Sequence, residues 1–173
     1  MTAPQFDVAQ LSAMDQASFV AALEGIFEHS PWVAERAWEH RPYADRDALL
    51  AALVQEMRAA TAEERHALIS AHPELAGKAA VRGELTAEST SEQRGAGLDS
   101  CTPEEFARLQ ALNAAYRARF GIPFVVAVRG RDRAAILAAL EARLGNSAEA
   151  ETAEALGQIE RIAALRLEDR VSA

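Results

Sequence analysis

The chain has 173 residues, half of them hydrophobic, and a net charge of −8 at pH 7. This length suits one domain with a sizeable core, whereas the acidic balance argues against a general nucleic-acid-binding protein, which needs a basic surface to meet phosphates. The single cysteine, Cys101, excludes an intrachain disulfide, and the absence of an apolar run of about 18 residues argues against a membrane-spanning protein.

In the first half of the chain, apolar residues spaced three and four apart predict amphipathic helices. Serine, aspartate or threonine precedes several of these stretches, where its side chain can cap a helix, and Pro31 suits a first helical position. A capping box at Thr61–Glu64 predicts the start of the fourth helix. Residues 1–9 are expected to form a loose arm. The four predicted helices cover Leu11–Phe27, Ser30–Arg41, the stretch that begins at Asp45, and Thr61 to about Ser70.

The second half begins with an interruption. Pro73 disfavours a helical conformation at His72, so the fourth helix should end near Ala71. Residues 75–101 are rich in glycine, serine and threonine, and we expect them to be the least regular region, in which parts could be helical. Residues 123–128 predict a buried extended segment whose backbone groups need partners. The remaining predicted helices begin at Thr102 and end at Gly121, begin at Asp132 and end at Gly145, and run from about Ala150 to Arg170.

These elements predict an all-α fold in one compact domain over residues 1–173, with about eight helices and one short extended buried segment. Strands do not alternate with helices, and no repeat or low-complexity linker divides the chain. The arginine- and alanine-rich composition is typical of a high-GC bacterial coding sequence. Because no signal peptide precedes the first helix and the C-terminal tripeptide is not of the peroxisomal type, we expect a cytoplasmic protein.

Metal and nucleophile chemistry find little support in the sequence. The four histidines form no H-x-x-x-H pair, so no metal site is predicted. Ser89 and Ser91 do not lie in a G-x-S-x-G elbow. Cys101 stands just before a helix N-terminus, which could lower its pKa, but no base is assigned to it. Phosphate-binding glycine motifs are absent, which argues against a nucleotide site.

Acid–base chemistry is better supported. His72 lies at an enforced helix end, where an imidazole can donate and accept protons, although it could simply cap that helix. Glu92 lies in a polar segment suited to binding an anion, although it could be a solvated carboxylate. Arg166 shares an apolar helix face with Ile159 and Ile162, so it must reach the surface or pair with a carboxylate or an anionic substrate. The sequence alone does not show that these groups converge.

Five stretches of the chain resemble, in order, the 2-oxo-4-hydroxy-4-carboxy-5-ureidoimidazoline (OHCU) decarboxylases of the pathway from urate to allantoin. The H-P-E-L block and the S-x-x-E-Q block are the most specific of them. The matching stretches are Phe27–Trp38, Ala71–Lys78, Leu85–Gln93, Leu112–Tyr116 with Phe120–Val126, and Ile162–Leu167.

The resemblance implies a cofactor-free, all-helical homodimer that decarboxylates its substrate to (S)-allantoin. It implies that His72 is the proton donor, that Glu92 is a second catalytic group, and that Arg166 is a third, with the nearby Arg161 as the alternative. Exposed backbone groups of the extended segment are expected to read the ureide. The substrate-binding residues that it implies are Pro73, Ser89, Thr90, Ser91, Glu92, Gln93, Phe124, Val125, Val126, Ala127 and Val128.

Two other functions stay open at this point. A hydrolase acting on a related ureide would depend on a metal or release ammonia. A non-enzymatic helical interaction module would show no turnover and a large exposed apolar patch. For the decarboxylase, the expected partners are its small ureido-imidazoline substrate and a second copy of the chain, with functional association to urate oxidase and 5-hydroxyisourate hydrolase. Neither nucleic acid nor membrane is an expected partner.

Overall fold

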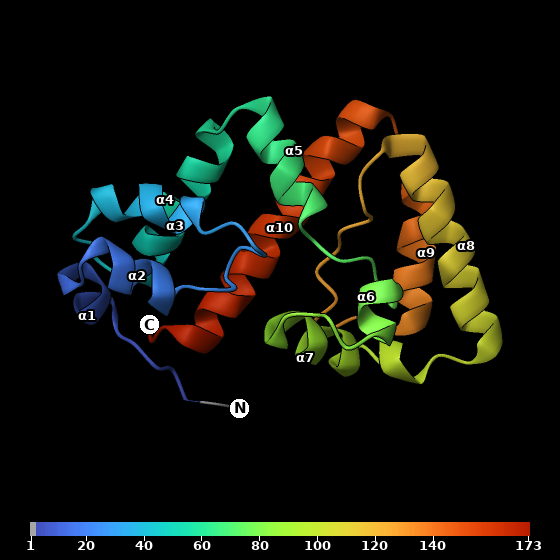
Figure 1. The fold of residues 1–173 in the computed structure, drawn as a ribbon, viewed down its shortest axis with the longest axis horizontal. Coiled ribbons are helices and arrows are strands. Elements are labelled where there is room, and N and C mark those ends of the chain that lie inside the picture. The colour runs from blue at the N-terminus through green and yellow to red at the C-terminus, as the bar shows by residue number, and fades with distance from the viewer. Residues whose placement is uncertain (1–2) are drawn as a thin grey trace. The chain divides into compact units, whose positions relative to one another are not determined.

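The structure is a computed structural model that describes residues 3–173 (Figure 1). Those residues form ten α-helices, two short 3-10 helices and no strand beyond one isolated bridge, which confirms the all-α prediction. No helix among them combines the length and the apolar character that a membrane span requires. The helices are α1 (Val8–Ala13), α2 (Gln16–Ala22), α3 (Trp32–Ala37), η1 (Trp38–His40), α4 (Arg46–Ala59), α5 (Ala62–Ser70), α6 (Lys78–Val81), α7 (Ala87–Gly95), η2 (Leu98–Ser100), α8 (Pro103–Phe120), α9 (Arg133–Arg143) and α10 (Ala148–Arg170).

The chain divides into two compact units. Unit 1 consists of Met1–Leu68 and Glu160–Ala173, and unit 2 consists of Ile69–Ile159. Helices α5 and α10 therefore contribute residues to both units. That all 173 residues act as one domain stays a prediction.

Unit 1 has its core among α1–α4 and the C-terminal part of α10. Leu11, Phe19 and Leu49 are fully buried in it, and the ring of Phe19 stacks on that of Tyr43 at 5.9 Å. The prediction of one helix over Leu11–Phe27 is wrong. The apolar spacing continues through this stretch, but the Asp15 side chain accepts a hydrogen bond from the Ser18 N–H and begins a second helix.

The N-terminal arm is also more ordered than expected. Helix α1 begins at Val8, and Phe6 forms an isolated parallel bridge with Val171 at the C-terminal end of the chain. The Gln5 N–H donates to the Arg170 carbonyl at 3.0 Å. The prediction of a loose arm is therefore wrong over the part that the structure describes, and residues 1–2 lie outside the described residues.

Unit 2 contains α6–α9 and the N-terminal part of α10, and α8 packs beside α9 (Figure 1). The predicted helix starts are confirmed here: Thr102 and Glu105 form a capping box at α8, and Asp132 caps α9. Helix α8 ends at Gly121, whose φ of 69° lies in the left-handed region that glycine tolerates. The longest connection, residues 121–132, joins α8 to α9 and contains the predicted extended segment.

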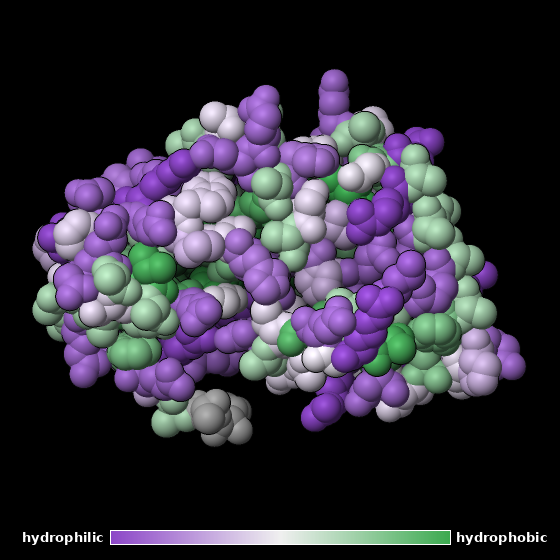
Figure 2. Space-filling view, viewed as in Figure 1, coloured by the Kyte–Doolittle hydropathy of each residue, from purple (hydrophilic) through white to green (hydrophobic). Residues whose placement is uncertain are grey.

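Polar residues cover most of the face shown in Figure 2, as the charge content of the chain leads one to expect. Among the described residues, Val81 and Phe106 are the exposed large hydrophobic side chains, and both belong to unit 2. Phe106 lies in the first turn of α8 and is 38% exposed.

Candidate active site

His72 follows the end of α5 and is buried, with 6% of its surface exposed. Its backbone N–H donates to the Ile69 carbonyl at 3.1 Å, which closes the last turn before Pro73. The predicted helix end is thereby confirmed, because α5 stops at Ser70. The Nε2 atom of the imidazole is shielded from solvent. A buried imidazole on irregular backbone is suited to deliver a proton to a ligand in a fixed direction.

The polar stretch that contains Ser89–Gln93 lies in the region expected to be the least regular, but it forms a helix, α7. Thr86 caps α7 by accepting a hydrogen bond from the Ser89 N–H at 3.2 Å. In a helix, five consecutive side chains point around the whole axis. Accordingly Ser89 and Gln93 are buried, Glu92 and Thr90 are half-buried, and Ser91 is exposed. Ser89, Glu92 and Gln93, at i, i+3 and i+4, therefore form the inward face of α7.

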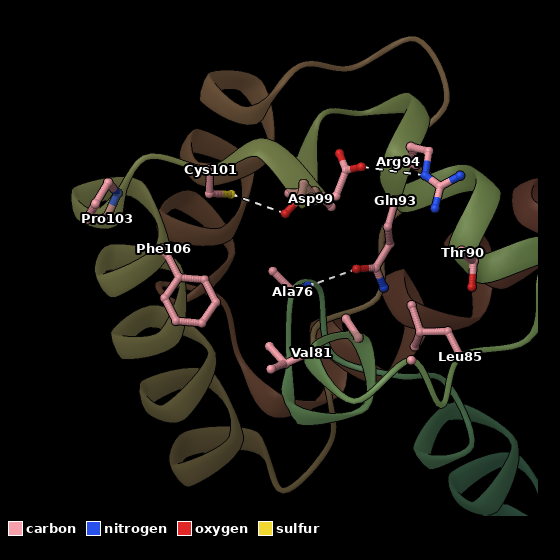
Figure 3. Close-up of a pocket in the computed structure, with 13 residues that line it drawn as sticks. Ala76, Val81, Leu85, Thr90, Gln93, Arg94, Asp99, Cys101, Pro103 and Phe106 are labelled. Carbon is pink, nitrogen blue, oxygen red and sulfur yellow. Dashed lines mark hydrogen bonds and ion pairs between the residues drawn. The ribbon is translucent and has the colours of Figure 1, made fainter.

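The Gln93 side chain binds the loop that follows His72. Its Oε1 accepts from the Ala76 N–H at 2.9 Å, and its Nε2 lies 3.5 Å from the Glu74 carbonyl (Figure 3). Helix α8 binds the same loop, because the Asn113 amide donates to the Leu75 carbonyl at 3.0 Å. Unit 2 thus brings α7, α8 and the loop after His72 into direct contact.

Residues 123–128 are all buried and form neither helix nor strand, as predicted. The expectation that their backbone groups are exposed and free for a ligand is wrong for three of them. The Val125 carbonyl accepts from Arg143 Nη1 at 2.6 Å, the Ala127 N–H donates to Gln158 Oε1 at 3.0 Å, and the Val128 carbonyl accepts from the Arg131 N–H at 2.9 Å. A buried segment outside a sheet satisfies its backbone with side chains, and α9 and α10 supply them here.

A buried polar cluster, consisting of Arg143, Glu151, Tyr116 and Asn146, supports this segment. Glu151 is fully buried and accepts from Arg143 Nε at 2.8 Å, from the Tyr116 hydroxyl at 2.7 Å and from Asn146 Nδ2 at 3.2 Å. Burial, and then the hydrogen bond to Glu151, raise the pKa of Tyr116, so the hydroxyl stays protonated and remains a donor. The Arg143 guanidinium also lies 4.5 Å from the centre of the Phe124 ring. The cluster therefore holds the segment through two contacts, one to the Val125 carbonyl and one to the Phe124 ring.

Arg166 belongs to unit 1 and is 4% exposed. Its Nη1 donates to Glu28 Oε2 at 2.7 Å and to the Gly25 carbonyl at 2.7 Å. Of the alternatives that the sequence left open for Arg166, the structure shows pairing with a carboxylate, that of Glu28, which is 1% exposed. Arg161, the alternative, is exposed. The other predicted site residues, His72, α7 and the segment, belong to unit 2.

Unit 2 also contains a pocket of about 530 Å³ between the 76–85 region, α7 and the start of α8 (Figure 3). Thr90 and Gln93 line it, whereas His72 and Glu92 do not. Cys101 lines it too, and its thiol donates to the Leu98 carbonyl at 3.5 Å. Burial raises the pKa of this thiol, so the structure gives no support to a nucleophilic cysteine. No cluster of metal-ligating side chains occurs among residues 3–173.

The model of the OHCU decarboxylase family matches residues 12–168 of the chain. The chain belongs to this family. It is 41% identical to the 2-oxo-4-hydroxy-4-carboxy-5-ureidoimidazoline decarboxylase of Haloferax volcanii, over 97% of this chain and 98% of that protein. It is also 38% identical to the uric acid degradation bifunctional protein of a Bacillus species, over 92% of this chain and 31% of that protein. Among solved structures, an (S)-allantoin synthase matches with a TM-score of 0.77 and 30% identity, over 95% of this chain and 54% of that one.

The sequence analysis did not single out three of the buried charged residues, Arg143, Glu151 and Glu28. A signal for Arg143 was present, because Ile136, Leu140 and Arg143 fall at i, i+4 and i+7 on one face of α9. The same kind of spacing had singled out Arg166. Glu151 gave no such signal, since an acidic residue in the first turn of a helix usually faces solvent and the helix dipole favours it there.

Proposed function

We propose that the chain is a carboxy-lyase of urate degradation that converts OHCU to (S)-allantoin. The observation that carries the proposal is the buried His72 in the H-P-E-L block of an OHCU decarboxylase family member, at the end of α5 and ahead of a loop that α7 binds. A histidine in this setting has the burial and the fixed backbone that a directional proton donor requires.

The proposed reaction has two steps. The bond to the carboxylate carbon breaks, carbon dioxide leaves, and the electron pair is taken up by the adjacent ring imine, so that no added electron sink is required. Burial of the carboxylate away from water favours this step, because the charged group is poorly solvated while carbon dioxide is neutral. The ring carbon of the resulting enol then takes a proton from His72 on one face, while the enol O–H proton passes to the ring nitrogen that took up the electron pair and the enol oxygen becomes the ring carbonyl, which yields a single enantiomer of allantoin.

Helix α7 supplies the groups proposed to orient the substrate. Ser89 and Glu92 lie one turn apart, so both can address the same ligand from one helix face. The Glu92 carboxylate is proposed to bind the substrate hydroxyl or ureido group and to maintain the protonation state of His72. Thr90 is half-buried and is retained as a proposed contact. Ser91 is exposed, so it is the least favoured of the residues predicted to bind the substrate.

The extended segment is proposed to read the ring amides of the substrate through its second backbone edge. In extended backbone, residues two apart direct their N–H and C=O groups to the same edge. Val125 and Ala127 each use one of these groups on Arg143 or Gln158. We therefore propose that the edge at Phe124 and Val126 faces the substrate. The N–H and C=O of one residue, Val126, match the adjacent C=O and N–H of a cyclic amide.

Arg166 is proposed to hold the anionic part of the substrate. A guanidinium can bind a carboxylate through two parallel hydrogen bonds, and its charge favours binding of the anion. Glu28 and the Gly25 carbonyl both bind Nη1, which fixes the orientation of the planar group. Arg166 is preferred to Arg161 for this role because a buried, oriented guanidinium is better preorganised than an exposed one.

The proposed enzyme works without a cofactor, as a cytoplasmic homodimer. Its substrate is short-lived, so functional association with urate oxidase and 5-hydroxyisourate hydrolase would limit spontaneous decay to racemic product. The match to part of a bifunctional protein named for uric acid degradation supports such an association. Size-exclusion chromatography with light scattering tests the dimer, and co-elution with the two upstream enzymes tests the association.

A chiral coupled assay tests the function. Urate, urate oxidase and 5-hydroxyisourate hydrolase generate the substrate in the cuvette, and circular dichroism follows (S)-allantoin with and without this protein. We expect His72→Asn to abolish the stereoselective rate above background. The matched control is His66→Asn, which makes the same change at an exposed position of α5 and should retain activity. Unchanged formation of (S)-allantoin by His72→Asn would remove the proposed role, and ammonia release would favour a hydrolase.

A further inference from the structure

We propose that Gln110 and Asn113 of α8 are positioning residues for His72, acting through the backbone of the loop at residues 73–77. The inference rests on the proposed function, because it concerns the proton that His72 delivers. Neither residue belongs to the groups assigned above to the substrate. Both residues donate hydrogen bonds to backbone carbonyls of this loop.

The loop after His72 is a tight turn. The Gly77 N–H donates to the Glu74 carbonyl at 3.3 Å, and a Cβ atom at Gly77 would lie only 2.9 Å from the Cβ of Glu74. Ala76 has a φ of 48°, in the left-handed region that alanine rarely adopts. Such a conformation persists only where the surrounding structure holds it, and it occurs often at functional sites.

Two glutamines from different helices hold Ala76 in this conformation. Its N–H donates to Gln93 of α7 at 2.9 Å, as Figure 3 shows, and its carbonyl accepts from Gln110 of α8 at 2.7 Å. Both backbone polar groups of the strained residue are therefore bound by side chains. The conformation depends on these two bonds because the loop has no regular secondary structure to impose it.

Helix α8 binds the two preceding residues as well. Asn113, which is 3% exposed, donates to the Leu75 carbonyl at 3.0 Å, and Arg117 lies 2.7 Å from a carboxylate oxygen of Glu74. Gln110, Asn113 and Arg117 fall at i, i+3 and i+7, so one face of α8 holds Glu74, Leu75 and Ala76 in register. The more exposed Arg117–Glu74 pair contributes least to the attachment of the loop to α8.

The bonds from α8 to Leu75 and Ala76 fix the backbone next to His72, and through it the orientation of the His72 ring. On its N-terminal side His72 is fixed by α5, through its own N–H and the Ile69 carbonyl. On its C-terminal side Pro73 restricts φ, and the next fixed points are the bonds to residues 74–76. When the bonds from α8 are lost, the backbone that follows His72 is held less firmly. The imidazole then samples more directions, and it protonates both faces of the enol.

The test is Gln110→Met, which keeps the length of the side chain and removes the donor to Ala76. We expect kcat to fall about tenfold, because small misplacements of a reacting group cost about that much or more, while KM changes less than about twofold. We also expect the enantiomeric excess of (S)-allantoin to fall. The comparison sample is wild-type protein diluted to the same total rate, in which spontaneous decay contributes equally.

The enantiomeric excess separates positioning from loss of folded protein. A smaller folded fraction lowers the rate but leaves the selectivity equal to that of diluted wild type, and that result would overturn the proposal. Gln55→Met, the same substitution at an exposed position of α4, should match wild type in both respects. If Gln110→Met does not fold, Gln110→Glu, which retains the size and removes the donor, takes its place. Failure of wild type to form (S)-allantoin would instead refute the proposed function.

Discussion

Each of the two units contains one buried arginine–glutamate pair, and the two pairs differ in what surrounds them. In unit 2, Arg143 and Glu151 lie eight residues apart, and the glutamate also binds Tyr116 and Asn146. In unit 1, Arg166 binds Glu28 from 138 positions away in the sequence, together with a backbone carbonyl in the same stretch as Glu28. The first pair joins residues close in the sequence and binds the Val125 carbonyl, whereas the second joins the two ends of the chain and binds the Gly25 carbonyl.

The difference shows what an arginine on an apolar helix face can and cannot indicate. Both arginines sit on such faces, and both pair with a buried glutamate. The spacing does not distinguish a guanidinium that holds the protein from one that holds a ligand. Each arginine uses Nη1 on a backbone carbonyl, that of Val125 or that of Gly25, so the distinction rests on the family resemblance, which proposes Arg166 and not Arg143 for the substrate.

The largest expected effect is on stability, at Glu151. Glu151→Gln removes the charge that compensates Arg143, and an uncompensated buried charge costs about 3–5 kcal/mol of unfolding free energy. Urea unfolding followed by circular dichroism measures this loss. The control is Glu160→Gln, which breaks the more exposed pair with Arg58 and should change the unfolding free energy by about 1 kcal/mol or less. A loss at Glu151 no larger than at Glu160 would remove the distinction between buried and exposed pairs.

The next effect sharpens the contrast between structural and functional arginines. The double variant Glu28→Gln with Arg166→Met removes both charges, and replacing a whole buried pair costs little stability, about 2 kcal/mol or less. We expect kcat/KM to fall about 10²- to 10³-fold, as when one preorganised anion-stabilising group is lost. The corresponding variant Arg143→Met with Glu151→Gln should lose stability but less than about tenfold in kcat/KM when it is folded. Equal losses of activity in the two variants would contradict the assigned roles.

The parts of the fold that could be predicted are those encoded by neighbouring residues. The capping box at Thr102 and the proline after His72 fix helix ends through contacts within four residues, and both predictions are confirmed. The position of helix α7 could not be predicted, because serine, threonine and glycine have low helix propensity. It forms because tertiary packing of its buried face, with Ser89 and Gln93, outweighs that propensity.

The candidate site divides in the same way. His72 and Arg166 could be singled out, because a helix end and an apolar stripe are visible in the sequence. The side chains that hold these regions in place could not be predicted, because they contact them only after folding. Glu28 binds Arg166 across 138 positions in the sequence, and Gln110 binds Ala76 across 34. Free backbone groups were predicted for the extended segment because the sequence offers it no second strand. The structure instead supplies side chains from α9 and α10 as its partners.

The smallest expected effect concerns the pH dependence that Tyr116 gives to the unit 2 cluster. Burial raises the pKa of Tyr116 above its ordinary value, so the stabilising contribution of the protonated hydroxyl is complete below about pH 10 and is lost as the pH rises through the folded-state pKa. Tyr116→Phe should lower the unfolding free energy by about 1–2 kcal/mol near neutrality, through the lost hydrogen bond to Glu151. It should also reduce the further loss of stability at high pH.

Urea unfolding at pH 8 and at pH 11 measures both effects. The control is Tyr43 in unit 1, the other tyrosine of the chain, whose hydroxyl donates to the Ala37 carbonyl. Burial raises the pKa of Tyr43 to about 12, so its own contribution is lost between about pH 10 and 12. Tyr43→Phe should therefore also reduce the loss of unfolding free energy at high pH, but without disturbing Glu151.

Of the two tyrosine hydroxyls, that of Tyr116 binds a buried carboxylate. The double variant Tyr116→Phe with Glu151→Gln should therefore lose less unfolding free energy than the sum of the two single losses. Simple additivity of the losses would show that Tyr116 is not coupled to the pair.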